Sequence, residues 1–337
     1  MSYRVTLKPS GHQYQAADNE TLLQSADDAG FKLPYGCRNG ACGACKAKVV
    51  EGRVALGEFA GNALSAADRD ADITLLCCAK PLSDLVLEVR EVSIAGGIEV
   101  KTLPCRVQKM ETLAPDVIAL QLKLPASERL QFMAGQYIEF ILKDGGRRAF
   151  SLANAPHHDE YLEVHVRLVP GGQFTGHVFE GMKEKDILRF EGPLGSFFLR
   201  EDSNKPIIML AGGTGFAPIK ALVEHALHSK IERPIHIYWG ARDRAGLYQA
   251  ALPEQWAAEH AQINYVPVLS DAAPNDAWSG RTGLVHQAVL ADFADLSGFQ
   301  VYACGAPAMI EAAQKDFAAA GLPAEEFFAD SFTFAPR

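Results

Sequence analysis

The chain has 337 residues, 48% of them hydrophobic, which supplies enough apolar mass for two or three cores and excludes a single small domain. Its 32 Lys and Arg against 41 Asp and Glu give a charge of -9 with no basic stretch, which argues against nucleic acid as a partner. No apolar run approaches the roughly 20 residues of a membrane span, and residues 1–10 lack the apolar core of a signal peptide, so we expect a cytoplasmic protein with no membrane partner.

The first region combines strand-like and helical patterns. Residues 3–7 alternate apolar and polar side chains, which is typical of a strand, and residues 22–26 have the apolar spacing of a short helix. Residues 85–89 form another strand-like run. The small residues at 93–97 that follow are suited to a tether, so we expect the first domain to end there.

Cysteine spacing is the most specific signal of this region. Cys37, Cys42 and Cys45 have the spacing C-x4-C-x2-C, and with Cys77 they match the plant-type [2Fe-2S] pattern and resemble plant-type ferredoxins. Small residues between them let the loop wrap a cluster and bring amide groups near the sulfurs. A zinc site in a nucleotide-binding sensor is the alternative, although zinc ribbons usually pair two C-x2-C units. The adjacent Cys78 leaves the fourth ligand open.

Short strand-like segments recur in the second region. They cover residues 117–124, 136–142 and 162–168 and are separated by Gly and Pro turns, which indicates an antiparallel barrel. After Pro206 the pattern changes to a strand, a glycine run and a helix with apolar spacing, which indicates an α/β nucleotide-binding fold. We therefore predict domains over residues 1–93, 101–201 and 202–337, with a linker over 94–100.

Residues 148–154, R-A-F-S-L-A-N, resemble the flavin motif of the ferredoxin-NADP reductase superfamily. An arginine supplies a forked donor for a flavin phosphate, an aromatic ring can lie against the flavin, and a serine hydroxyl can bond near its reactive nitrogen. Residues 171–175 resemble the superfamily's G-x-x-[ST] pyrophosphate loop, and residues 165–167 occupy the strand that usually lines the flavin. Taken singly, each segment also has an ordinary structural interpretation.

The resemblance thus implies a flavin site, with FAD expected and FMN left open. Its residues are Arg148, Ala149, Phe150, Ser151, His165, Val166, Arg167, Gly171, Gly172 and Thr175. Near the C-terminus, Phe332 is either a displaceable cover of the flavin face or a side chain packed on the nucleotide domain.

The glycine run at 212–215 lets a dinucleotide phosphate approach the backbone at a helix N-terminus. Pro218 replaces the third glycine of the usual fingerprint, as in the G-T-G-x-A-P form of the superfamily, and residues 304–309 resemble its C-G-x-P-x-M signature. The resemblance implies these NAD-binding residues: Gly212, Gly213, Thr214, Gly215, Arg242, Cys304, Gly305 and Pro307. Arg242 and the adjacent Asp243 leave NADPH open beside the expected NADH.

Nearly the whole chain resembles fused reductases with an N-terminal ferredoxin domain, above all the CDP-6-deoxy-glucoseen reductases. The resemblance implies a β-grasp [2Fe-2S] domain, an antiparallel β-barrel flavin domain and an α/β parallel-sheet NAD(P)-binding domain. It also implies hydride transfer from NADH to FAD, positioned by Ser151 and Cys304, then single-electron transfer through the cluster to an acceptor protein. A dehydrase component is the expected acceptor. A phenol hydroxylase or aromatic-ring dioxygenase component is the alternative.

Overall fold

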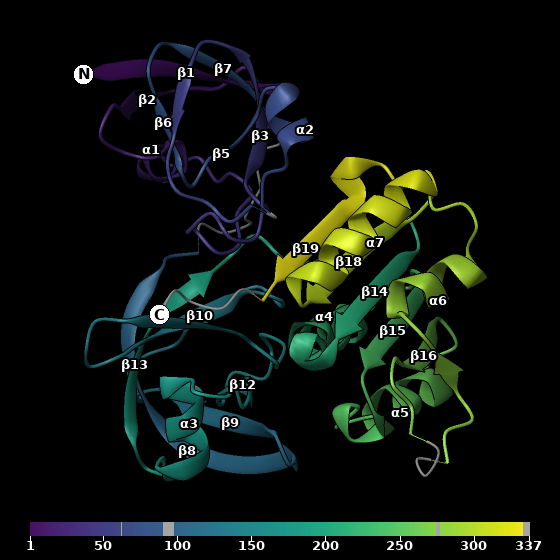
Figure 1. Ribbon diagram of the computed structural model, residues 1–337. Helices are drawn as coiled ribbons and strands as arrows, with labels where there is room; N and C mark the ends of the chain where they lie inside the picture. The colour runs from purple at the N-terminus through teal and green to yellow at the C-terminus, as the bar shows by residue number, and fades with distance from the viewer. Residues whose placement is uncertain (62, 90–97, 274–276, 333–337) are drawn as a thin grey trace. The chain divides into compact units, whose positions relative to one another are not determined.

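The computed structural model describes residues 1–61, 63–89, 98–273 and 277–332, and the predicted tether at 93–97 lies outside this part of the chain. The chain forms two compact units, residues 1–98 and 99–337. Figure 1 shows the elements of both units, coloured from purple at the N-terminus to yellow at the C-terminus. Within the described residues, no helix is long and apolar enough to span a bilayer.

The first unit is a five-stranded mixed sheet in the order β2-β1-β7-β3-β5, with a small β4-β6 sheet beside it. Alternation in the first strand buries Val5 and Leu7 completely, and the helix α1 is capped by Thr21, whose hydroxyl accepts the Gln24 N–H. The predicted strands at both ends and the predicted helix are therefore confirmed. The elements are β1 (Ser2–Lys8), β2 (Gln13–Ala17), α1 (Leu22–Asp28), β3 (Lys46–Glu51), β4 (Val54–Leu56), α2 (Ala66–Asp70), β5 (Ile73–Leu75), β6 (Ala79–Pro81) and β7 (Leu85–Glu88).

The second unit begins with six antiparallel strands in the order β11-β10-β13-β8-β9-β12. A bridge between Leu152 and Val164 joins the two outer strands, so the sheet closes on itself as the predicted barrel. Its elements are β8 (Lys101–Ala114), β9 (Val117–Lys123), β10 (Tyr137–Ile141), β11 (Arg147–Ser151), β12 (Leu162–Arg167), α3 (Gln173–Glu180) and β13 (Ile187–Leu194).

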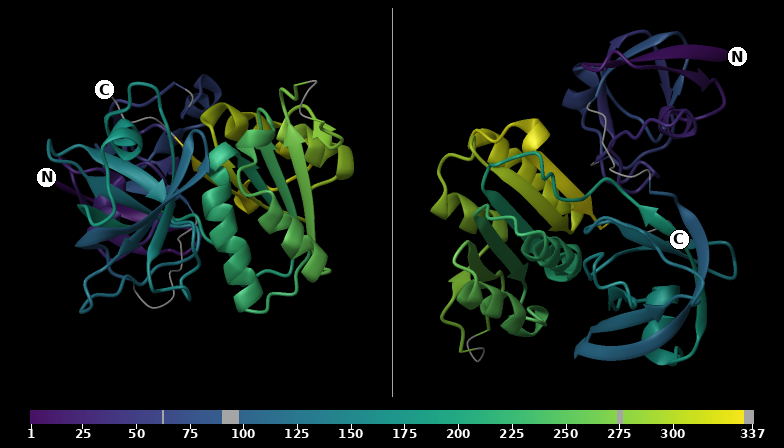
Figure 2. Two further views of the ribbon diagram at one scale, coloured as in Figure 1. Left: turned by 90° about the horizontal axis from the view of Figure 1, so that it is seen from below. Right: turned by 180° about the vertical axis from the view of Figure 1, so that it is seen from behind.

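A parallel sheet in the order β17-β16-β15-β14-β18-β19 completes this unit. Alternate residues of its central strand enter two cores, Met209 beneath α4 and α5 and Leu210 beneath α6 and α7, so helices cover both faces (Figure 2). The elements are β14 (Ile207–Gly212), η1 (Gly213–Gly215), α4 (Phe216–His228), β15 (Ile235–Ala241), η2 (Arg244–Gly246), α5 (Ala251–Glu259), β16 (Ile263–Leu269), β17 (Arg281–Thr282), α6 (Val285–Asp292), β18 (Gln300–Gly305), α7 (Pro307–Ala319), η4 (Ala324–Glu326) and β19 (Phe327–Ser331).

Candidate functional site

The four predicted cluster ligands form two pairs. Cys45 Sγ lies 3.3 Å from Cys77 Sγ. In the other pair, the Cys37 N–H donates to Cys42 Sγ, and the amides of Ala41 and Cys42 donate to Cys37 Sγ, over 3.2 to 3.3 Å. Two pairs of thiolates fit two irons sharing four cysteines better than they fit one tetrahedral zinc.

Cys78 lies beside this arrangement rather than within it. Its Sγ is 3.6 Å from Cys77 Sγ, and it packs against Gly40, where an added Cβ would come within 2.7 Å of the sulfur. Gly40 has φ +75°, so a side chain there would be strained as well as crowded. The sulfur that approaches Cys45 belongs to Cys77, which favours Cys77 as the fourth ligand.

The flavin motif lies on β11, where two adjacent arginines differ in their partners. Arg147 forms ion pairs with Glu139 and Glu191 at 3.3 and 3.1 Å. Arg148 is half-buried, donates only to the Arg147 carbonyl at 2.8 Å and has no ion pair among the described residues. Its guanidinium keeps most of its donors for an external anion, which fits a flavin phosphate.

Phe150 follows the arginine on the same face of the strand. Its ring centroid lies 5.7 Å from that of Phe140 and 5.3 Å from that of Phe174, so the half-buried ring packs on the barrel core. The predicted Ala149 is exposed, while Ser151 is buried at the end of β11.

The predicted pyrophosphate loop leads into the helix α3. Gly171 has φ +75°, and the next residue, Gly172, precedes the helix without any side-chain cap. The Thr175 hydroxyl accepts the Val169 N–H at 3.1 Å, which ties the first turn of α3 to the end of the preceding loop. The first amide groups of α3 therefore remain available for an anion, as this loop requires.

Strand β12 presents its polar residues to the nucleotide-binding half of the unit. Val166 is buried in the barrel core, whereas His165 points the other way, with its Nδ1 3.0 Å from the Tyr248 hydroxyl. Arg167 pairs with Asp116, and its buried Nε has no partner among the described residues. Of the predicted flavin residues, His165 and Arg167 thus lie where the barrel meets the nucleotide-binding elements.

The glycine turn after β14 lies beside Arg167 of the barrel strand β12. Gly213 has φ +53°, and its carbonyl accepts the indole N–H of Trp239 at 2.9 Å. The guanidinium of Arg167 lies 3.8 Å from the place of a Cβ at this glycine. Helix α4 begins after Gly215 with no side-chain cap, so its amide groups and the Arg167 guanidinium suit a dinucleotide phosphate.

We expect Gly215→Ala to lower stability by about 1–3 kcal/mol, because its Cβ would lie 2.0 Å from the Cys304 carbonyl oxygen and would force the turn away from β18. The same displacement should raise the KM for NADH. Thermal unfolding and steady-state kinetics measure the two effects. At Gly298 nothing lies within 4 Å of an added Cβ, so Gly298→Ala should change neither. Unchanged KM and stability in Gly215→Ala would contradict the packing argument.

A third group joins the two predicted catalytic side chains. The Ser151 hydroxyl donates to Asp330 Oδ2 at 3.0 Å, and Cys304 Sγ lies 3.9 Å from the same oxygen. Cys304 and Asp330 are register partners of the parallel strands β18 and β19, which places their side chains on one face. Sequence reasoning missed Asp330 as a site residue. Its place in the run D-S-F near the C-terminus was the only available signal.

This group lies at the carboxyl ends of strands where the order of the sheet reverses. Gly212 ends β14 and Cys304 lies in β18, on the side opposite to β15. Crevices at such positions hold ligands in open α/β sheets. Pro307 is the first residue of α7 and follows Gly305 by two positions, so this signature also ends at a helix N-terminus.

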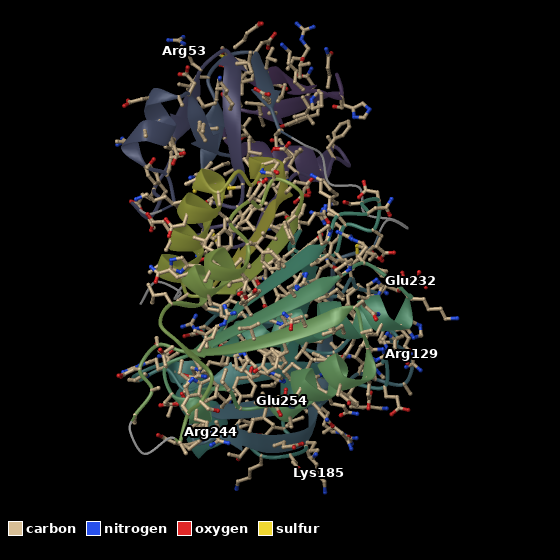
Figure 3. The ribbon with its side chains drawn as sticks, turned by 90° about the vertical axis from the view of Figure 1, so that its right-hand side faces the viewer. Arg53, Arg129, Lys185, Glu232, Arg244 and Glu254 are labelled. Carbon is tan, nitrogen blue, oxygen red and sulfur yellow. The ribbon has the colours of Figure 1, made fainter. Side chains whose placement is uncertain are left out.

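Two of the remaining predicted residues have other surroundings. The Phe332 N–H donates to the Gly305 carbonyl at 2.9 Å, and its half-buried ring packs on the core beneath α4 and α5. Arg242 is exposed, and Asp243 uses its carboxylate to cap η2 by accepting the Gly246 N–H at 2.9 Å. Arg244 points outward at the edge of the molecule (Figure 3). Asp243 is therefore occupied locally, and the preference between NADH and NADPH stays a prediction.

Buried charges make this unit sensitive to acid. Burial raises the pKa of Glu163, but the hydrogen bond from His165 and the charge of Lys220 outweigh it and lower the pKa from 4.5 to about 2. A depressed carboxyl pKa stabilises the fold above the unfolded value, here roughly 3 kcal/mol, and that contribution is lost as the pH falls from 4.5 towards 2. We expect Glu163→Gln to flatten the decline in stability over this window, measured by urea unfolding at several pH values. The exposed Glu180 is the control, since Glu180→Gln should keep the wild-type slope. Parallel curves for all three proteins would contradict the assignment.

Comparisons with known proteins agree with this arrangement. Family models match residues 5–82 as a 2Fe-2S iron-sulfur cluster binding domain, 104–199 as an oxidoreductase FAD-binding domain and 209–315 as an oxidoreductase NAD-binding domain. The chain is 43% identical over 332 residues to the CDP-6-deoxy-L-threo-D-glycero-4-hexulose-3-dehydrase reductase of Yersinia pestis, covering 98% of this chain and 99% of the relative. It is 39% identical to the reductase component of phenol 2-monooxygenase from Pseudomonas sp., covering 93% and 89%.

A crystal structure of the Amycolatopsis cytochrome P450 reductase GcoB matches with a TM-score of 0.77 and 33% identity, over 98% of each chain. The three domains predicted from sequence are thus present in the predicted order. The chain belongs to the iron-sulfur flavoprotein reductases, NAD(P)H-dependent oxidoreductases that carry a 2Fe-2S domain, an FAD-binding barrel and an NAD-binding domain in one polypeptide.

Proposed function

We propose that this chain supplies single electrons from NADH to a dehydrase that acts on a CDP-6-deoxy-hexulose. The observation that carries the reductase chemistry is the meeting of Ser151, Asp330 and Cys304, which come from the barrel and from the nucleotide-binding sheet. The acceptor is supported by the full-length similarity to the Yersinia reductase, which exceeds the similarity to the phenol 2-monooxygenase component.

Bound FAD supplies the link between a two-electron donor and a one-electron acceptor. The chain's own residues hold and orient the groups. Arg148 and the N-terminus of α3 bind flavin phosphate, and the N-terminus of α4 with Arg167 binds the dinucleotide phosphate. Cys37, Cys42, Cys45 and Cys77 hold the cluster.

Ser151 and Cys304 position the reacting rings, and neither acts as a nucleophile. Burial raises the pKa of Cys304 well above that of a free thiol, and the neighbouring Asp330 carboxylate raises it further, so the group stays a neutral thiol. Asp330 can accept from both side chains at once. This shared acceptor orients the Ser151 hydroxyl towards one fixed point at the interface.

An oxygenase component is the second candidate acceptor. The phenol 2-monooxygenase reductase of Pseudomonas sp. is 39% identical, and the Amycolatopsis structure is that of a cytochrome P450 reductase. Both matches extend over most of this chain, so the domain order does not distinguish the acceptors.

Anaerobic reduction of the purified protein tests the donor and the order of cofactors. We expect NADH to bleach the flavin absorbance faster than NADPH and to produce the EPR signal of a reduced [2Fe-2S] cluster. A protein without iron or flavin would overturn the proposal.

Reconstitution tests the acceptor. The reductase is mixed with NADH and either a purified CDP-6-deoxy-hexulose 3-dehydrase or the oxygenase component of a phenol hydroxylase. We expect turnover that depends on the reductase with the dehydrase and little with the oxygenase. Efficient turnover with the oxygenase alone would replace the first candidate by the second.

A further inference from the structure

Helix α4 is attached to the segment that follows the flavin motif. One turn from the helix start, Lys220 Nζ donates to the Ala153 carbonyl at 2.9 Å. Glu224 lies one turn further and accepts the Ala155 N–H at 3.3 Å. Lys220 and Glu224 are also paired with each other at 3.0 Å. Two side chains of α4 therefore hydrogen-bond to the Ala153 carbonyl and the Ala155 N–H, which lie only two and four residues after Ser151.

The same lysine reaches a second strand of the barrel. Lys220 Nζ lies 3.3 Å from Glu163 Oε1 on β12, and His165 Nε2 lies 3.2 Å from that oxygen. A carboxylate only accepts, so His165 carries its proton on Nε2, and its Nδ1 accepts a hydrogen bond from the Tyr248 hydroxyl. The contacts thus form a continuous chain from α4 through the barrel strand and back to the nucleotide-binding half.

These groups are buried, and the Lys220 charge is paired with the two carboxylates of the network. The side chains of Lys220, Glu163 and Glu224 are 11%, 10% and 18% exposed, and that of His165 is not exposed. Burial disfavours the lysine charge, but Glu163 and Glu224 outweigh it and raise the pKa of Lys220. Burial lowers the pKa of His165 and keeps the ring neutral. Compared with apolar side chains of the same size, a buried ion group of this kind adds little net stability because its desolvation is costly, so its main contribution is a fixed geometry.

Lys220 lies between the elements of the two predicted cofactor sites. Helix α4 receives the dinucleotide phosphate at its N-terminus, beginning at Phe216, and Ser151 belongs to the flavin motif. Helix α4 lies beside the barrel in all three views (Figures 1 and 2). Lys220 therefore links the element that holds one cofactor to the strand that holds the other.

We propose that Lys220 is a positioning residue for hydride transfer: with Glu163 and Glu224 it holds the helix that receives the dinucleotide phosphate in register with the barrel strands of the flavin site. This inference rests on the proposed function and assigns it a residue outside both cofactor motifs. Lys220 touches neither reacting ring. It acts by fixing the distance and angle at which the rings meet, to which transfer rates are very sensitive.

Stopped-flow reduction of the holoenzyme by NADH tests the proposal. We expect Lys220→Met to lower the limiting rate of flavin bleaching at least about tenfold, while the NADH concentration at half-maximal rate changes less than about threefold and FAD stays bound. The long-wavelength absorbance of nicotinamide stacked on flavin should weaken in parallel. Lys220→Arg keeps the charge and should recover most of the rate. An unchanged limiting rate in Lys220→Met would overturn the proposal.

Two controls separate this from loss of folding and from failure of the proposed function. Lys315→Met replaces an exposed lysine of α7 and should behave as wild type. If Lys220→Met does not fold, the triple variant Lys220→Met, Glu163→Gln, Glu224→Gln leaves no unpaired buried charge and should show the same rate loss. A wild-type rate in the triple variant would also overturn the proposal. Wild-type protein that NADH cannot reduce would instead reject the reductase function itself.

Discussion

Replacing Cys42 by serine should abolish electron delivery to any acceptor that takes electrons from the cluster. Cys42 is paired with Cys37 in the ligand loop, and a serine oxygen is a poor ligand for iron that prefers thiolate. Substitution of residues that merely support metal ligands costs roughly 10- to 100-fold, so we expect a loss of at least about 100-fold for a ligand. NADH oxidation with ferricyanide, which the flavin can reduce directly, should remain close to wild type.

Iron content, visible absorbance and both activities measure the outcome. The adjacent cysteines Cys77 and Cys78 supply a matched pair: Cys77→Ser should behave as Cys42→Ser, whereas Cys78→Ser should keep its iron, because Cys77 is the one that lies 3.3 Å from Cys45. Equal loss of both activities in Cys42→Ser would contradict the order of electron flow. Iron loss in Cys78→Ser but not in Cys77→Ser would identify Cys78 as the fourth ligand in place of Cys77.

Arg148→Ala should release the flavin. The guanidinium has no ion pair among the described residues, so its charge is available to a phosphate. A hydrogen bond to a charged group contributes about 1.5–3 kcal/mol, and its loss should weaken FAD binding roughly 10- to 100-fold. Flavin retained through gel filtration and titration of the apoprotein with FAD measure the change.

Arg147 is the matched control for this prediction. It precedes Arg148 directly on β11 but is paired with Glu139 and Glu191, so Arg147→Ala should keep its yellow colour. The exposed position of these pairs limits the expected stability loss to at most about 1 kcal/mol. An Arg148→Ala protein that stays fully yellow would remove the residue from the flavin site.

Local patterns predicted most of the fold. Alternation over residues 3–7 predicted β1, and the apolar spacing after the glycine run predicted α4, because each depends on the period of one element. The cysteine spacing and the glycine run likewise allowed a cluster loop and a phosphate-binding turn to be predicted from the sequence. In both cases the predicted site residues are neighbours in one loop, so their spacing along the chain sets their spacing in the folded protein.

Placement within the barrel was harder to predict. His165 was expected on the flavin-lining strand, and the strand formed, but its ring bonds Tyr248 from the other half of the unit. The alternation of β12 divides its residues between a core face and an interface face. The sequence does not say what covers the second face, because that depends on how two sheets far apart in the chain pack.

The sequence by itself determined the family and the order of three domains, and it supplied the loops that we predict hold each cofactor. Only the tertiary structure decided which side chains meet between those loops: Asp330 with Ser151, 179 residues away, Lys220 with Glu163, and Cys77 rather than Cys78 beside Cys45. The reason is physical. Spacing within a loop is fixed by covalent geometry, whereas contacts between distant segments depend on strand register and packing, which the whole folded chain sets together.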